Sequence, residues 1–121
     1  MTRIGRLKRR AEFLAAAAAN RKWVAPGLVL QARKVDSDPT SADIRLGFTA
    51  SRKVGNAVLR NRARRRLKAA AAEVLRDAAI AAKGTDLVLI ARPATVARDY
   101  RALLEDFRRG LKKLGVTGAA S

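Results

Sequence analysis

The stretch KVGNAVLRNRARRRLK, residues 53–68, decides the fold because a helix gives its apolar residues a common face. At 100° per residue, one side of a helix over residues 57–76 carries Leu59, Ala63, Leu67, Ala70 and Val74. This spacing predicts an amphipathic helix that packs one side on a hydrophobic core.

The other side of the predicted helix is basic. Its centre and flanks carry Asn61, Arg64, Arg65 and Lys68, with Arg60, Arg62 and Arg66 beside them. No carboxylate occurs between Asp43 and Glu73, although like charges at i, i+4 repel by about 0.2–0.5 kcal/mol per pair. Arginine is preferred to lysine, and its planar fork matches phosphate oxygens. We infer a polyanionic partner; the alternative is a merely solvated surface.

Gly55 and Asn56 precede the helix and allow two interpretations. The free backbone N–H groups at a helix start can hold a phosphate. Asn56 is equally suited to be an ordinary N-cap. The sequence leaves both open.

Outward from this helix, the pattern predicts a helix over 11–19, with a core stripe of Leu7, Ala11, Leu14 and Ala18. Strands are expected over 28–35 and 44–51, as antiparallel neighbours joined by an eight-residue turn. The basic helix is expected to run to Gly84, with a buried central strand in TDLVLIARPA, residues 85–94. A last helix starts at Tyr100 behind an Asp99 cap and ends near Gly115.

These elements predict an α+β fold, a two-layer α/β sandwich with a small mixed sheet of three to four strands in the order α-β-β-(β)-α-β-α. The bracketed strand is a short one that residues 44–52 could hold. We expect one RNA-binding domain over residues 1–115 and a disordered tail over 116–121.

Composition narrows the function. The chain has 121 residues and a net charge of +17, so nucleic acid is the leading partner class and anionic membrane the second. It has no histidine and no cysteine, which excludes Ser/His/Asp and Cys/His catalysis by the protein and cysteine-ligated zinc. We expect no catalytic residue, no protein metal site, no small-molecule substrate and no membrane partner. The lack of cysteine fits the cytoplasm.

Two further patterns are interpreted as structural features without a functional role. The Arg-rich segment 1–23 is similar in composition to a mitochondrial transit peptide, but its core stripe favours a helix of the mature domain. The acidic pairs Asp36/Asp38 and Glu105/Asp106 are interpreted as turn chemistry and a solvated helix surface, not as a catalytic pair.

The window SRKVGNAVLRNRARRRLK, residues 51–68, resembles the Arg-Asn-Arg motif region of the bacterial ribonuclease P protein component. RLKRRAEF, LVLQARKV, IRLGFTASRKV and DLVLIARPA resemble the family's first helix and strands, so the likeness covers nearly the whole chain. The resemblance implies a subunit of a ribonucleoprotein endonuclease (a hydrolase) that removes the 5′ leader from precursor tRNA. It also implies that the RNA carries catalysis and holds the magnesium, and that the fold contains a left-handed βαβ crossover.

The resemblance implies two sets of contact residues. Contacts to the catalytic RNA are expected from Arg60, Asn61, Arg62, Arg64, Arg65 and Lys68, and phosphate contacts at the helix start from Gly55 and Asn56. A cleft for the precursor tRNA leader is expected from Phe13, Ala17, Val29, Gln31, Arg33, Phe48, Arg52 and Lys53. Ala17 and Gln31 stand where the family often has aromatic residues, which weakens base stacking there. Phe13 has a core residue as its alternative interpretation.

Two other functions share these features. A ribosomal or other structured-RNA-binding protein has the same charge and size. A basic DNA-binding protein is the third candidate, although no helix-turn-helix spacing or dimer seam is evident.

Overall fold

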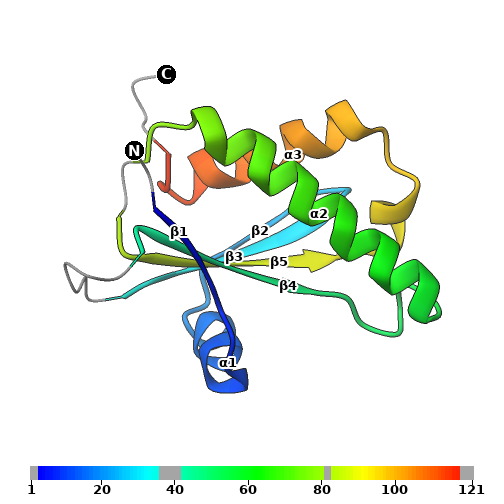
Figure 1. Cartoon of the computed structure of the whole chain (residues 1–121), viewed down its shortest axis with the longest axis horizontal. Coiled ribbons are helices and arrows are strands. Elements are labelled where there is room, and N and C mark those ends of the chain that lie inside the picture. Colours follow the sequence, from blue (N-terminus) through cyan, green and yellow to red (C-terminus); the bar gives the residue numbers. More distant parts are fainter. Residues whose placement is uncertain (1–2, 36–41, 81–82, 118–121) are drawn as a thin grey trace.

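A computed structural model of the chain describes residues 3–35, 42–80 and 83–117. A single five-stranded sheet has the order β1-β4-β5-β3-β2, with α1 on one face and α2 and α3 on the other (Figure 1). The elements are β1 Ile4–Arg6, α1 Arg10–Ala18, β2 Lys22–Val24, β3 Leu28–Lys34, β4 Ile44–Thr49, α2 Ala57–Asp77, β5 Thr85–Ala91, the 3-10 turn η1 Pro93–Val96 and α3 Tyr100–Lys113.

The predicted α+β class with a mixed sheet is confirmed, but the number of strands and the order of the first elements differ from the prediction. The sheet has five strands because β1 and β2 are three-residue edge strands, too short to show a period of two. The chain therefore enters the sheet before its first helix. The possible extra strand in 44–52 is not formed, since β4 is continuous over Ile44–Thr49.

The strand β5 lies at the centre of the sheet, as its apolar run predicts. It pairs in parallel with β4, with Leu46 opposite Leu87, and antiparallel with β3, with Leu30 opposite Leu89. The expected direct pairing of β3 and β4 is wrong because β5 lies between them. Long connections leave strand neighbours undetermined by sequence alone.

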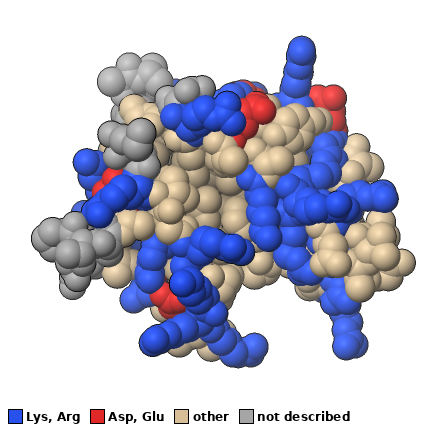
Figure 2. Space-filling model, in the orientation of Figure 1, with Lys and Arg blue, Asp and Glu red and all other residues tan. Residues whose placement is uncertain are grey.

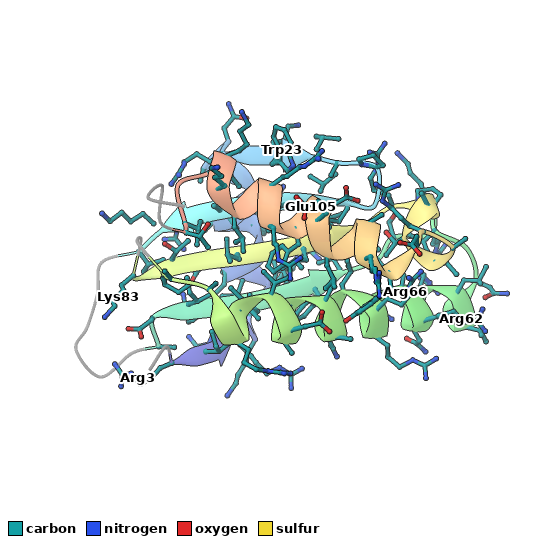
Figure 3. The ribbon with its side chains drawn as sticks, turned by 90° about the horizontal axis from the view of Figure 1, so that it is seen from above. Arg3, Trp23, Arg62, Arg66, Lys83 and Glu105 are labelled. Carbon is teal, nitrogen blue, oxygen red and sulfur yellow. The ribbon has the colours of Figure 1, made fainter. Side chains whose placement is uncertain are left out.

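The connection from β4 through α2 to β5 is left-handed. With the strands turned to point upward and α2 in front of the sheet, β5 lies to the left of β4 (Figures 1 and 3). Right-handed crossovers are the rule in about 98% of cases. The expectation from the resemblance is therefore met against the general preference.

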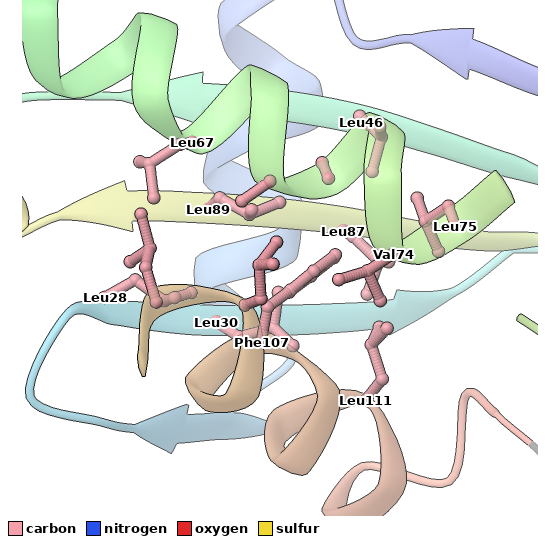
Figure 4. Close-up of a cluster of buried hydrophobic side chains, with 14 of the residues drawn as sticks. Leu28, Leu30, Leu46, Leu67, Val74, Leu75, Leu87, Leu89, Phe107 and Leu111 are labelled. Atoms are coloured by element: carbon pink, nitrogen blue, oxygen red, sulfur yellow. The ribbon is translucent and has the colours of Figure 1, made fainter. Parts of the chain in front are cut away.

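The core lies between the sheet and the pair α2 and α3 (Figure 4). The predicted stripe of α2 is buried at Ala63, Leu67, Ala70 and Val74, and Leu59 is partly exposed. α3 contributes Leu103, Phe107 and Leu111, and Asp99 caps it by accepting a hydrogen bond from the Ala102 N–H at 3.2 Å. β3 and β5 supply the facing leucines.

The stripe predicted for the first helix is wrong beyond Leu7, which is buried but precedes α1. Ala11 and Ala18 are exposed and Leu14 is 56% exposed, whereas Ala16 is buried and Phe13 partly buried against the sheet. In an alanine-rich helix the apolar pattern is nearly uniform around the axis, so it does not select the buried side.

The end of α2 and the end of the domain also differ from prediction. α2 stops at Asp77, not at Gly84, because Ala78 is extended and Ile80 forms an antiparallel bridge with Thr117. Val116 is 1% exposed within the main core. Ordered structure thus runs at least to residue 117, two residues past the predicted boundary, and the remainder of the predicted tail, 118–121, lies outside the described residues.

Candidate nucleic-acid interface

The start of α2 is built by Gly55 and Asn56. Gly55 has φ +142°, and a Cβ there would lie 2.6 Å from Leu59 Cδ1, so only glycine fits. The Asn56 Oδ1 accepts a hydrogen bond from the Leu59 N–H at 3.0 Å, which is N-cap geometry. The cap interpretation of Asn56 is confirmed, and phosphate binding at this end stays a prediction.

The basic face of α2 is defined as Arg60, Asn61, Arg62, Arg64, Arg65 and Lys68. Asn61, Arg62, Arg65 and Lys68 are exposed, and Arg60 and Arg64 are partly buried. Arg64 donates from Nη2 to Asn61 Oδ1 at 2.6 Å, which orients its guanidinium. Within the described ranges, none of the five cations of this face forms an ion pair. Figure 2 shows the resulting concentration of cations over the N-terminal half of α2.

Arg66, although next to this face, has a different role. It donates to the carbonyls of Thr95 at 2.9 Å, Val96 at 2.7 Å and Arg98 at 2.5 Å. These contacts tie α2 to η1, and Figure 3 shows Arg66 between the two elements. Arg66 is thus a structural residue, which the alternation of arginines in the sequence does not reveal.

We expect Arg66→Ala to lower the free energy of unfolding by about 2–3 kcal/mol, because three carbonyls lose a charged donor. The neighbouring Arg65→Ala removes an exposed side chain and should change stability by less than about 0.5 kcal/mol. Urea denaturation of both variants measures this. Equal stability of the two variants would contradict the structural role of Arg66.

The opposite face of the sheet, under α1, carries most of the predicted leader residues. Val29, Gln31 and Arg33 pair across the sheet with Ile90, Val88 and Asp86 and point to the same side. Val88 and Ile90 cluster with Phe13 and Ala16 of α1. Ala17 is exposed on α1, and Arg52 and Lys53 are exposed in the turn between β4 and α2.

Phe48 does not belong with these residues. It pairs with Leu89, a residue of the main core, and packs on the α2 side of the sheet. Its grouping with Phe13 is therefore wrong, since successive residues of β4 point to opposite faces.

Phe13 packs on the sheet at Gly47. A Cβ at Gly47 would lie 2.5 Å from Phe13 Cε1 and 3.0 Å from Leu7 Cδ1. The ring is therefore packed largely as a core residue, and Gly47 is the residue that makes room for it.

We expect Gly47→Ala to lower the free energy of unfolding by about 1–3 kcal/mol, because the added methyl must push the Phe13 ring off the sheet. The double variant Gly47→Ala with Phe13→Leu should recover part of that loss. Thermal or urea unfolding of the single and double variants tests this. A Gly47→Ala protein as stable as wild type would show that α1 is loosely packed.

An ion network that the sequence did not predict holds α1 to the same face. Asp86 is 1% exposed and receives two hydrogen bonds from Arg45, from Nε and from Nη2, each at 2.7 Å. Arg33 lies 3.8 Å away, and Arg45 also contacts Glu12 at 2.5 Å. The hydrogen bonds that Arg45 donates to Asp86, together with the charges of Asp86 and Glu12, raise the pKa of Arg45.

Glu12 Oε1 also accepts hydrogen bonds from the backbone N–H groups of Lys8 and Arg9, each at 3.0 Å. These hydrogen bonds, together with Arg45, lower the pKa of Glu12. A lowered carboxyl pKa stabilises the fold above the unfolded-state value, and this stabilisation is lost as the pH falls through the lowered value. The junction of α1 with the sheet is therefore expected to be weakened by acid.

The basic first part of α2, which has no acidic residue before Glu73, is carried by a small mixed sheet with helices on both faces. Together they define a protein of the nucleic-acid-binding class. The model of the Ribonuclease P family matches residues 1–115, and the chain belongs to that family.

Relatives agree over nearly the full length. The chain is 52% identical to the ribonuclease P protein component of Paramagnetospirillum magneticum, over 93% of this chain and 84% of the relative. It is 53% identical to that of Gluconacetobacter diazotrophicus, over 97% of both chains. The fold is similar to the Staphylococcus aureus RNase P protein, with a TM-score of 0.72 at 24% identity, covering 93% of this chain and 97% of that one.

Proposed function

We propose that this chain, as the protein subunit of ribonuclease P in tRNA 5′ processing, binds the catalytic RNA through the basic face of α2. Family membership supports the subunit role and an RNA partner. The assignment of this binding surface rests on one observation: the five cations on one face of α2 form no described ion pair. Arginines without a carboxylate partner are available for bidentate contacts to phosphate.

We place the 5′ leader of the precursor tRNA on the α1 side of the sheet. The surface there combines the partly exposed Gln31 and Arg33 with the exposed Ala17 on α1. Because Phe13 is packed on Gly47, stacking contributes less than polar contacts from these strand residues. Arg52 and Lys53, exposed beyond the end of β4, extend the cationic surface for the leader backbone.

We assign the magnesium of the reaction to the RNA. Magnesium sites need oxygen ligands in nearly octahedral arrangement. The buried carboxylates of this protein are already used, Asp86 by Arg45 and Asp106 by Arg98. In the parts of the chain that the structure describes, no three acidic, histidine or cysteine side chains converge. The protein then contributes binding and orientation of the substrate.

We place this activity in the cytoplasm. None of the described helices is long and apolar enough to cross a bilayer.

Reconstitution tests the function. The purified protein is mixed with the RNA subunit of its ribonuclease P and a precursor tRNA, and leader removal is followed across magnesium concentrations. We expect cleavage at lower magnesium than with the RNA alone, and tighter binding of precursor than of mature tRNA. Protein without RNA should cleave nothing. Cleavage by the protein alone, or co-sedimentation with ribosomal subunits without stimulation of cleavage, would contradict the proposal.

A further inference from the structure

A second surface feature lies between the sheet edge and α2. It is a groove of about 480 Å³ lined by residues of β1, β4 and α2. Its apolar lining consists of Ile4, Leu46, Phe48, Ala71, Ala72 and Leu75, with Gly5 beside them. The remaining lining residues are Arg6, Lys68 and Arg76. Figure 2 shows it as a hollowed apolar area with lysine and arginine side chains around it.

The groove is open because the side chains of α2 are small at its floor and wall. Ala71 and Ala72, both with small side chains, line the groove, and β1 is only three residues long. Ile4 stays 45% exposed and Phe48 is partly exposed. Apolar surface that is left uncovered beside cations is suited to binding a partner.

The charge around the groove identifies the chemistry of that partner. No Asp or Glu occurs among the described residues that line it, while three cations do. Lys68 Nζ lies 6.0 Å from the centre of the Phe48 ring, so the aromatic ring and the positive charge are adjacent. A flat apolar group that carries a phosphate matches both, because bases stack on aromatic rings and phosphates pair with cations.

We propose that this groove binds an unpaired nucleotide of the RNA subunit, with its base against Phe48 and its phosphates at Lys68 and Arg76. This inference rests on the proposed function. Lys68 belongs both to the groove and to the basic face of α2, so an RNA that follows α2 reaches the groove without leaving the helix. The leader surface lies on the other side of the sheet, which favours the RNA subunit over the substrate as the source.

Filling the groove tests the proposal. Ala72→Phe places a ring in the groove from an exposed position of α2, and Ala69→Phe adds the same ring at an exposed position of α2 that does not line it. We expect Ala72→Phe to weaken affinity for the RNA subunit at least about fivefold, the lower end of what one stacked base contributes. Ala69→Phe should weaken it less than about twofold. Equal affinities of Ala72→Phe and wild type, or equal losses in both variants, would overturn the groove as a nucleotide site.

Chemical probing of the RNA subunit gives a direct readout. Wild-type protein should protect a small number of unpaired nucleotides that Ala72→Phe leaves reactive, while protections along the basic face persist in both. Phe48→Leu keeps the groove apolar but removes the ring, and should also lose these protections. Circular dichroism and thermal unfolding show whether each variant is folded under the binding conditions.

The outcomes separate this inference from the proposed function. If wild-type protein stimulates cleavage and Ala72→Phe matches it in affinity and in protections, only the groove proposal is overturned. If wild-type protein neither binds the RNA subunit nor stimulates cleavage, the proposed function and the groove proposal both fall.

Discussion

Replacing Arg45 by methionine should lower the free energy of unfolding at pH 7 by about 3–5 kcal/mol, the largest loss of stability expected from one side chain. Methionine keeps much of the apolar stem of Arg45 and removes its guanidinium. The carboxylate of Asp86 is 1% exposed and then retains only Arg33, 3.8 Å away, as a described charged partner. An ionised carboxylate that loses these hydrogen-bond donors in a buried site raises the free energy of the folded state.

The matched control is Arg109→Met on α3. Arg109 is also paired with a carboxylate, Glu105 at 3.6 Å, but both side chains are more than half exposed. Exposed pairs contribute about 0–1 kcal/mol, so this variant should unfold nearly like wild type. Urea denaturation with a common m-value measures both. A loss below about 1 kcal/mol for Arg45→Met would show that water reaches Asp86.

A double variant distinguishes the loss of the Arg45–Asp86 ion pair from the cost of leaving the Asp86 carboxylate buried without its partner. Arg45→Met with Asp86→Asn removes the uncompensated carboxylate, and we expect it to recover most of the stability lost in Arg45→Met. Replacing both partners of a buried pair is often nearly neutral, whereas removing one is not. A double variant as unstable as Arg45→Met would indicate that Arg45 acts through Glu12 and α1.

The main features of α2 and β5 could be predicted because each depends on local periodicity. Leu59, Ala63 and Leu67 recur every four residues among arginines, and this spacing places them on one side of a helix. The run LVLI over residues 87–90 is typical of a strand buried on both faces. The position of Phe48 also follows from local periodicity. The alternation along β4 places Phe48 with Ile44 and Leu46 on the core side, whereas the resemblance assigns it to the leader surface, and the structure agrees with the alternation.

Other features depend on long-range contacts that no local pattern encodes. Arg45 occupies an outward strand position typical of a solvated side chain, and only the pairing of Arg45 with Asp86 across β4 and β5 makes it part of a buried network. Arg66 has the same sequence signature as Arg65, yet η1 places three carbonyls beside it. The sheet order and the left-handed crossover likewise come from packing of distant segments.

The second large effect concerns RNA affinity, through the combined variant Arg62→Ala, Arg64→Ala and Arg65→Ala. If each arginine neutralises one phosphate, the slope of log affinity against log salt should fall in magnitude by roughly 2–3. At about 0.1 M salt this corresponds to a loss of roughly 100- to 1000-fold in affinity for the RNA subunit. Arg62 and Arg65 are exposed, Arg64 is partly buried, and none of the three belongs to the core stripe, so stability should change little.

A second triple variant, Arg101→Ala, Lys112→Ala and Lys113→Ala, is the control for net charge. It removes the same three charges from exposed positions of α3, away from the basic face of α2. If affinity depends on where the cations lie, this variant keeps the salt slope within about 1 of wild type, whereas the α2 variant does not. Filter binding of both variants at several salt concentrations distinguishes the cases. Equal slopes for the two variants would mean that the charge of +17 attracts RNA as a diffuse field, and that the arginines of α2 hold no particular phosphates.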